Sequence, residues 1–349
     1  MMNENNLTFC GKKIGEGYPP FIVAEVGFNH NGEVELAKEM IKAAADNGAD
    51  AVKLQTFLGE EMFSKLYRRN DPDNPENEIP IYQFYKRYEL TKEDYQEIIR
   101  FAEEQGIPLF STPFDEKSLD LIVELGMPAI KIASCDLTNL PFLKLAAQKK
   151  LPIVLSCGMG TMGEIELALE TIFSEDNEEV ILLYCVSNYP AEIEETDINS
   201  IKTLQSAFKV PIGFSDHTMG NLSAIVSATV GAVMIEKHFT SDRGLPGVDQ
   251  SISMEPAELK ELKETTINVM KLLGSGKREL RSSEKEIKKI IRRSLVAKCD
   301  IKKGEKITRD MLSIKRPETG ISPTDFDRVL GREARTDILA EEVLTWEMV

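Results

Sequence analysis

The 349-residue chain has no apolar run that approaches the roughly 20 residues needed to cross a bilayer. Its first residues, MMNENNLTFCGKK, are polar and lack the apolar core of a secretory signal. These two absences lead us to expect a cytoplasmic protein that has no membrane partner.

Cysteine is scarce and scattered. The chain has no CxxC pair, and an odd number of widely spaced cysteines is typical of free thiols in a reducing compartment. The five are Cys10, Cys135, Cys157, Cys185 and Cys299.

Positive charge is in deficit, with 42 Lys and Arg against 58 Asp and Glu and a formal net charge of −16. An acidic protein repels nucleic acid and anionic membranes, so neither is an expected partner. An anionic substrate would therefore need a locally basic site. The one basic cluster, KEIKKIIRR at 285–293, is better explained as a solvated helix or linker face than as an anion site.

Eight short, β-rich apolar runs recur through the first ~280 residues and are separated by segments with helical spacing of apolar residues. The runs are Phe21–Val26, Ala51–Gln55, Pro108–Ser111, Ala129–Ala133, Pro152–Ser156, Val180–Cys185, Pro211–Phe214 and Ala232–Ile235. One intervening helix is expected to begin at Thr91, with Asp94 in a capping box, and to end at Gly106. Eight alternations predict an α/β fold, a parallel (β/α)8 TIM barrel. A doubly wound open sheet is the alternative, but GFNHNG stands where its Gly-rich first turn is expected.

The chain divides by composition into three parts. We expect a catalytic barrel over residues 1–277, a charged linker over 278–292 and a small, mostly β domain over 293–349, with a tight turn at Lys303–Gly304. A domain this small is expected to bury little core of its own. Residues 57–90 form a Pro/Asn/Asp-rich loop, which is either a lid over the catalytic face or only a surface insertion.

Polar residues cluster where the predicted strands end. The carboxyl ends of all strands meet on one face of a parallel barrel, and that face carries the active site. All three histidines of the chain lie there: His30, His217 and His238. His217 and His238 end adjacent strands near carboxylates. Two imidazoles with open positions indicate a divalent metal such as Mn²⁺, which could polarise a substrate oxygen.

Lys53 and Lys131 each interrupt an apolar strand. A buried ammonium group is costly unless an anion pairs with it. The anion is either Glu25 or Glu236, or else a ligand, and the serines at neighbouring strand ends favour a phosphate or carboxylate ligand. The sequence contains no G-x-S-x-G motif and no evident Cys–His pairing, so covalent hydrolase chemistry is unsupported.

Six motifs together resemble the sialic acid synthase family, which includes the N-acetylneuraminate, legionaminate and pseudaminate synthases. They are AEVGFNHNG (24–32), VKLQTF (52–57), STPFD (111–115), KIASCD (131–136), GFSDHT (213–218) and EKHFT (236–240). The tail, with VAKCDIKKGEKIT and IKRPETGIS, is similar to the antifreeze-like (SAF) domain of that family.

The resemblance implies a role for each matching residue. His217 and His238 match the metal-binding histidines, for Mn²⁺ or alternatively Mg²⁺ or Co²⁺, and Glu25 and Asp136 match acidic positions near the reacting carbons. Arg316 matches an arginine that the small domain delivers into the partner's barrel, near the N-acyl group of the sugar, which implies a domain-swapped homodimer. The matching substrate-binding positions, mainly for phosphoenolpyruvate, are Lys53, Gln55, Thr112, Lys131, Ser134, Ser156, Ser187, Tyr189, Ser215 and Asp249.

The implied reaction condenses phosphoenolpyruvate with N-acetylmannosamine or a 2,4-diacetamido-6-deoxy hexose to give a nonulosonic acid and phosphate. Another phosphoenolpyruvate-dependent 3-deoxy-2-keto sugar acid synthase and a non-catalytic sugar-binding relative are the alternatives. Asp136, Cys157 and Tyr184 depart from the commonest pattern, where glutamate, threonine and histidine stand. These departures leave the reaction class intact and the sugar open.

Overall fold

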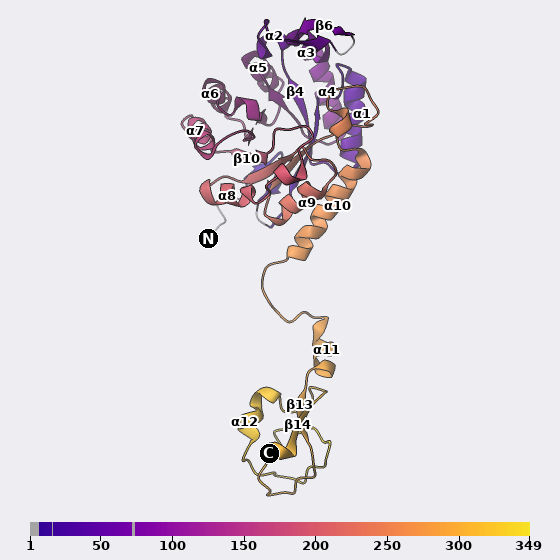
Figure 1. Cartoon of the computed structure of the whole chain (residues 1–349), viewed down its shortest axis with the longest axis vertical. Coiled ribbons are helices and arrows are strands. Elements are labelled where there is room, and N and C mark those ends of the chain that lie inside the picture. The colour runs from indigo at the N-terminus through magenta and orange to yellow at the C-terminus, as the bar shows by residue number, and fades with distance from the viewer. Residues whose placement is uncertain (1–6, 16, 72–73) are drawn as a thin grey trace. The chain divides into compact units, whose positions relative to one another are not determined.

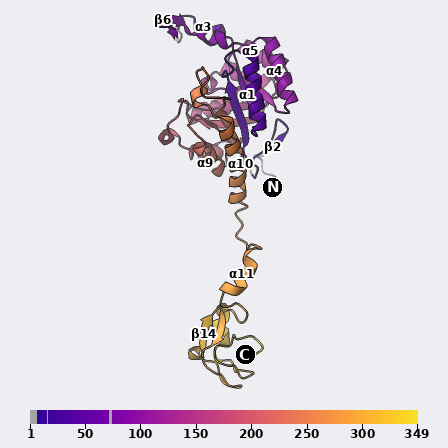
Figure 2. The same cartoon turned by 90° about the vertical axis from the view of Figure 1, so that its right-hand side faces the viewer.

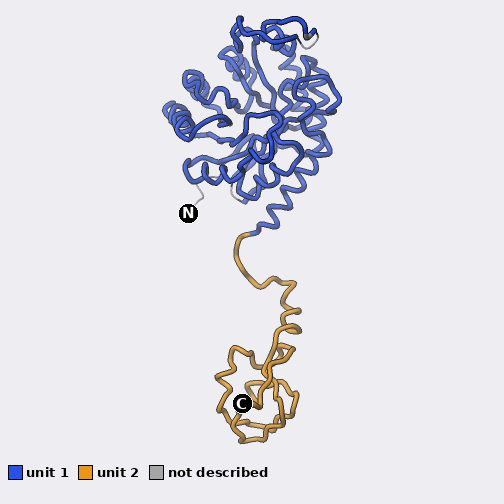
Figure 3. The backbone as a smooth tube through the Cα atoms, in the orientation of Figure 1, with its two compact units in different colours: residues 1–274 blue, residues 275–349 orange. Residues whose placement is uncertain are grey.

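The computed structural model describes residues 7–15, 17–71 and 74–349, which form two compact units over 1–274 and 275–349 (Figure 3). Within the described residues, no helix combines the length and the apolar character that a membrane crossing requires.

Unit 1 is a closed barrel of eight parallel strands, which confirms the predicted fold (Figure 1). Each predicted apolar run contributes one strand. In spatial order the strands are β3 (Phe21–Gly27), β4 (Ala51–Thr56), β7 (Leu109–Pro113), β8 (Ile130–Ile132), β9 (Ile153–Ser156), β10 (Val180–Cys185), β11 (Ile212–Asp216) and β12 (Met234–His238).

Helices surround the barrel and bury one apolar face each against the strands. They are α1 (Val34–Asp46), α4 (Lys92–Glu104), α5 (Glu116–Glu124), α6 (Leu140–Gln148), α7 (Met162–Phe173), α8 (Ser200–Ala207), α9 (Leu222–Thr229) and α10 (Pro256–Leu273). The predicted capping box of α4 is confirmed, since Thr91 accepts from the Asp94 amide and Asp94 accepts from the Thr91 amide. In Figure 2, α1 and α4 lie next to each other on the outside of the barrel.

The amino-terminal end of the barrel strands is closed by a hairpin that sequence analysis did not predict. It pairs β1 (Leu7–Phe9) with β2 (Lys12–Ile14). The Phe9 ring packs edge-on against Phe21 and Phe110 inside the barrel. Because this end is filled with apolar side chains, the polar residues of the strands are confined to the opposite end.

In its described residues, 57–71 and 74–90, the stretch at 57–90 contains secondary structure rather than a plain loop. It forms α2 (Gly59–Met62), the hairpin β5 (Arg68–Asp71) and β6 (Asn74–Pro80), α3 (Ile81–Tyr85) and a 3-10 turn (Lys86–Tyr88). Tyr85 packs against Phe57 and against Phe28, which follows β3. These ring contacts fix α3 to the barrel, and Figure 2 shows β6 and α3 projecting from it.

Unit 2 begins in irregular chain and contains α11 (Glu284–Ile291), the antiparallel strands β13 (Ser294–Ala297) and β14 (Leu312–Lys315), and α12 (Phe326–Val329). The predicted turn at Lys303–Gly304 is confirmed, since the Glu305 amide donates to the Lys302 carbonyl and Gly304 has a φ of 84°. The unit has a core of its own, smaller than that of the barrel, built around Leu295, Ile307 and Ile338.

Candidate active site

One cavity of about 480 Å³ opens among the carboxyl ends of the barrel strands. Nearly all the predicted site residues line it, although they come from all parts of the barrel sequence. Those residues are Glu25, Lys53, Gln55, Thr112, Lys131, Ser134, Ser156, Ser187, Tyr189, Ser215, His217, His238 and Asp249.

Lys53 and Lys131 are buried at this cavity among carboxylates. Lys53 Nζ lies 2.6 Å from Glu25 Oε2 and donates to Thr112 Oγ1 at 2.8 Å. Glu236 Oε1 lies between the two lysines, 3.9 Å from Lys53 Nζ and 3.8 Å from Lys131 Nζ. The pairing with Glu25 and Glu236, one of the two alternatives raised by the sequence, is therefore present in the structure.

Burial and neighbouring charge set the ionisation of these groups. Burial raises the pKa of Glu25 to about 7, against the opposing effect of Lys53. Burial also acts on Glu236, but the positive charges of Lys131 and Lys53 outweigh it and hold the pKa of Glu236 below its usual value. Burial lowers the pKa of Lys131. Lys131 therefore requires an anion close by to remain charged, and an anionic ligand or Glu236 can supply it.

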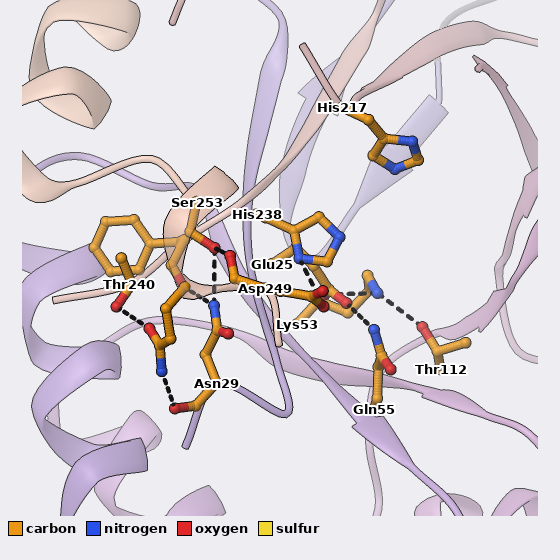
Figure 4. A network of polar contacts seen from close by, with 12 residues as sticks. Glu25, Asn29, Lys53, Gln55, Thr112, His217, His238, Thr240, Asp249 and Ser253 are labelled. Atoms are coloured by element: carbon orange, nitrogen blue, oxygen red, sulfur yellow. Dashed lines mark hydrogen bonds and ion pairs between the residues drawn. The ribbon is translucent and has the colours of Figure 1, made fainter. Parts of the chain in front are cut away.

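His217 and His238 face each other with ring centroids 5.8 Å apart (Figure 4). Burial lowers the pKa of each to about 4, so both imidazoles are neutral at pH 7. His217 Nδ1 lies 2.7 Å from the Val186 carbonyl oxygen and donates to it, which leaves the lone pair on Nε2. His238 Nδ1 lies 3.6 Å from Asp249 Oδ2.

The two histidines fit a divalent cation bound through imidazole nitrogen. Neutral imidazole is the ligating form, and one nitrogen of His217 is already oriented by a backbone carbonyl. Among the described residues, no group of three or more His, Cys, Asp and Glu side chains is arranged to hold a metal. An ion held by these two imidazoles alone would keep positions for water or substrate.

The third histidine belongs to a turn and does not line the cavity. His30 Nδ1 accepts a hydrogen bond from the Gly32 amide at 3.0 Å, and the ring is buried. Burial lowers the pKa of His30 to about 4.

Sequence reasoning missed Gly158 and the apolar roof of the cavity. A Cβ on Gly158 would lie 2.3 Å from Ser187 Oγ and 2.8 Å from Ser134 Oγ, so only glycine allows these hydroxyls to converge. A glycine two residues after the end of the fifth strand was the available signal. The roof residues are Phe28, Met62, Tyr85, Phe114, Met159 and Val248.

Two predicted residues are not part of the cavity lining. Asp136 lies in a 3-10 turn after β8 and accepts from Asn139 Nδ2 at 3.0 Å, while its neighbour Cys135 lines the cavity. Burial raises the pKa of Asp136. Arg316 follows β14 in unit 2 and is exposed. The roles assigned to these two residues remain predictions.

Residues 40–278 match the NeuB family, and residues 292–349 match the SAF domain. The chain belongs to the NeuB family. It is 38% identical to the N,N'-diacetyllegionaminic acid synthase of Legionella pneumophila over 344 residues, with 97% of both chains covered. It is 34% identical to the pseudaminic acid synthase of Helicobacter pylori over 331 residues, covering 94% of this chain and 97% of the relative.

A crystal structure described as the N-acetylneuraminic acid synthetase of Leptospira borgpetersenii in complex with citrate superposes on this NeuB-family chain with a TM-score of 0.73. The two are 38% identical, and the match covers 81% of this chain and 95% of the other. Because these relatives are acid synthases, this NeuB-family chain is an enzyme of the same general kind.

Proposed function

We propose that this protein condenses phosphoenolpyruvate with the open-chain aldehyde of an N-acylated sugar and releases a nonulosonic acid and phosphate. The observation that carries the proposal is the meeting of two buried lysines and two neutral histidines in one cavity of a NeuB-family chain. The lysines suit an anionic donor, and the histidines suit an ion that activates a carbonyl acceptor.

Phosphoenolpyruvate is assigned to the part of the cavity that contains Lys53 and Lys131. Its phosphate and carboxylate would take over from Glu25 and Glu236 as partners of Lys53 and Lys131. The hydroxyl of Ser156 is buried without a hydrogen-bond partner among the described residues, and it can donate to the same ligand. Further hydroxyls come from Thr112, Ser134, Ser187 and Ser215.

His217 and His238 are assigned to a divalent cation, Mn²⁺ or alternatively Mg²⁺ or Co²⁺. When bound, this ion supplies Lewis-acid polarisation of the aldehyde oxygen. The rings of Phe28 and Tyr85 line the same cavity and would offer apolar surface to a bound sugar.

In the proposed reaction, a C–C bond forms between C3 of phosphoenolpyruvate and the aldehyde carbon. Water adds to C2, the bond between C2 and the phosphate oxygen breaks, and the protons of water pass to the former aldehyde oxygen and to phosphate. The cavity lysines orient the phosphate and carboxylate during these steps. Glu25 is assigned to the sugar, since its raised pKa suits proton exchange near pH 7. Asp136 is assigned to the attacking water.

We assign the N-acyl group of the sugar to Arg316, delivered by unit 2 of one protomer to the barrel of its partner in a domain-swapped homodimer. Residues 292–349 match the SAF domain, which supports a substrate-recognition role for unit 2. A cytoplasmic location is also part of this proposal, because phosphoenolpyruvate is an intracellular metabolite.

The test is phosphate release from phosphoenolpyruvate with Mn²⁺, with and without a chelator. N-acetylmannosamine, a 2,4-diacetamido-6-deoxy hexose and phosphorylated aldoses are offered in parallel. Chelator-sensitive release that depends on one N-acylated sugar is expected and names the acceptor. Release with a phosphorylated aldose alone would favour another 3-deoxy-2-keto acid synthase. No release from folded, Mn²⁺-loaded protein would leave the non-catalytic alternative.

A further inference from the structure

Four buried side chains form a hydrogen-bond network beside the cavity, which we call the Asn29–Gln250 network: Asn29, Thr240, Gln250 and Ser253. Asn29 Nδ2 donates to the Phe239 carbonyl at 3.0 Å and to Ser253 Oγ at 2.9 Å. Gln250 Nε2 donates to the Asn29 carbonyl at 2.7 Å, and Gln250 Oε1 accepts from Thr240 Oγ1. All four residues are at most 1% exposed, so no bond in the network competes with bulk water.

The network fixes the segment that carries Asp249. Residues 239–255, between β12 and α10, contain no strand, but they include a 3-10 turn (Gln250–Ile252) and an isolated bridge between Phe239 and Met254. Ser253 Oγ donates to the Asp249 carbonyl at 2.6 Å, while Gln250 ties the next residue to the turn after β3. The position of Asp249 is therefore set by contacts with a residue more than 200 positions away in sequence, because the Gln250 side chain donates to the Asn29 backbone carbonyl across 221 residues.

The same segment is held a second time at Gly247. Asn31 Nδ2 donates to the Pro246 carbonyl at 2.7 Å. Gly247 has a φ of 154°, and a Cβ there would lie 2.8 Å from Gln250 Cγ and 3.1 Å from Asn31 Oδ1. The backbone at 246–250 thus packs directly on the residues that anchor it, and it has no room to slide along the turn.

Asp249 in turn lies beside His238. The distance from Asp249 Oδ2 to His238 Nδ1 is 3.6 Å, and His238 Nδ1 has no hydrogen-bond partner among the described residues. Figure 4 shows Asn29, Thr240 and Ser253 grouped on one side of Asp249, with the His238 ring on its other side. At 3.6 Å the two atoms are just beyond hydrogen-bond distance, and a small approach of the Asp249 carboxylate would make it the acceptor for Nδ1–H and leave the Nε2 lone pair free.

We propose that Asn29, Gln250 and Ser253 are positioning residues, which hold the Asp249 carboxylate against His238 Nδ1 so that Nε2 is presented to a divalent cation. The inference deepens the proposed function, on whose metal assignment it rests. His217 Nδ1 already donates to the Val186 carbonyl at 2.7 Å, whereas His238 Nδ1 lies 3.6 Å from its carboxylate. Both ligating rings would then be fixed by partners on the nitrogen that faces away from the ion, as is general for histidine ligands.

The test is the affinity of the full-length protein for Mn²⁺, measured without substrates from the electron paramagnetic resonance signal of the free ion. Gln250→Met removes both amide contacts at nearly constant volume, and Ser253→Ala removes one hydroxyl. Each variant is expected to raise the Kd for Mn²⁺ by about 10- to 100-fold, the usual effect of losing an outer partner of a metal-binding histidine. Asp249→Ala is expected to produce a loss in the same range.

A double variant separates positioning from general damage. If Gln250 acts through Asp249, then Gln250→Met adds nothing to the loss already present in Asp249→Ala. The control is Asn177→Ala, which removes another buried amide, bonded to the Leu151 carbonyl at 2.9 Å and remote from the cavity. This control is expected to lower the melting temperature and leave the Kd for Mn²⁺ unchanged.

The inference would be overturned by wild-type affinity in both Gln250→Met and Ser253→Ala, or by losses that add in full in the double variant. A wild-type protein that binds no divalent cation would overturn it as well. The proposed function fails by a different result. In that case the protein binds Mn²⁺ but releases no phosphate from phosphoenolpyruvate with any sugar.

Discussion

Four buried charges of the cavity, Glu25, Lys53, Lys131 and Glu236, are paired with one another. Removing one partner of such a set leaves another charge uncompensated, which costs more than the loss of an exposed pair. A substitution in this set can therefore change both the Kd for phosphoenolpyruvate and kcat, so both must be measured for each variant.

Glu25→Gln is expected to lower kcat by about 100-fold or more, because the amide cannot exchange a proton. The Kd for phosphoenolpyruvate should stay the same or fall, since Lys53 loses its competing partner at 2.6 Å. Phosphate release gives kcat, and calorimetry gives the Kd. Glu35→Gln, an exposed carboxylate of α1, is the control. Wild-type turnover in Glu25→Gln would remove the role of Glu25.

Asp136→Asn tests the least supported assignment, since Asp136 does not line the cavity. If Asp136 orients or deprotonates the attacking water, kcat falls by about 100-fold while phosphoenolpyruvate still binds. Turnover equal to that of the wild type would instead mean that Asp136 serves only the turn in which it accepts from Asn139.

The cysteines differ in environment. Burial raises the pKa of Cys157 to about 12, and Cys135, although its residue is exposed, has a pKa raised to about 11 by desolvation and by the Asp136 carboxylate. Cys299 is exposed. We expect Cys299 to react first with a disulfide reagent at pH 8 and Cys157 to react only on unfolding. Cys299→Ser should abolish the fast phase of the reaction with the reagent. Rapid labelling of Cys157 in the folded protein would contradict the expected order.

At the scale of elements, the segment at 57–90 contributes the roof of the cavity through α3. Phe84 is buried in the ring cluster, where it packs against Tyr85 and Tyr88 and beneath the Arg69 guanidinium. Loosening this attachment should weaken sugar binding if the segment is a lid, and should leave sugar binding unchanged if it is a surface insertion.

Phe84→Ala is expected to cost the segment about 3–5 kcal/mol of local stability, since it deletes a buried ring. Cleavage of residues 68–80 by a protease should accelerate, and the KM for the sugar should rise about 10-fold if α3 is a lid. Tyr82→Ala on the same helix is the control. Accelerated cleavage with an unchanged KM would support the surface-insertion interpretation.

At the scale of the whole molecule, each unit has a core of its own, so a substitution in one unit should leave the fold of the other intact. The contribution of each unit to activity can therefore be tested with a separate variant. Glu25→Gln is expected to inactivate the barrel, and Arg316→Ala is expected to remove the proposed N-acyl contact from unit 2. In a domain-swapped homodimer, mixing the two inactive variants creates one site with both residues intact.

Mixed and reassociated Glu25→Gln and Arg316→Ala proteins are expected to recover about a quarter of wild-type turnover, because half of the dimers are mixed and each has one intact site. Turnover after co-refolding measures this. Each variant refolded by itself is the control. No recovery, with mixed dimers present, would mean that Arg316 does not act in the partner's barrel.

The strands and helices of this protein could be predicted from the sequence because their signals are local. Each of the eight strands is an apolar run between turn residues, and the cap at Thr91 needs only Asp94, three residues away. Lys53, Lys131, His217 and His238 were identifiable because strand ends must converge on one face of a barrel.

Only the tertiary structure decided which partners these residues have. Three contacts join segments that are distant in sequence, and no local pattern encodes them: the packing of Phe9 on Phe110, the Phe28–Tyr85 contact, and the bond between Asn29 and Gln250. The same holds for the exclusion of Asp136 from the cavity lining, which depends on a turn rather than on a strand end. Local propensity and periodicity fix the elements, whereas packing across the closed barrel fixes the geometry of the site.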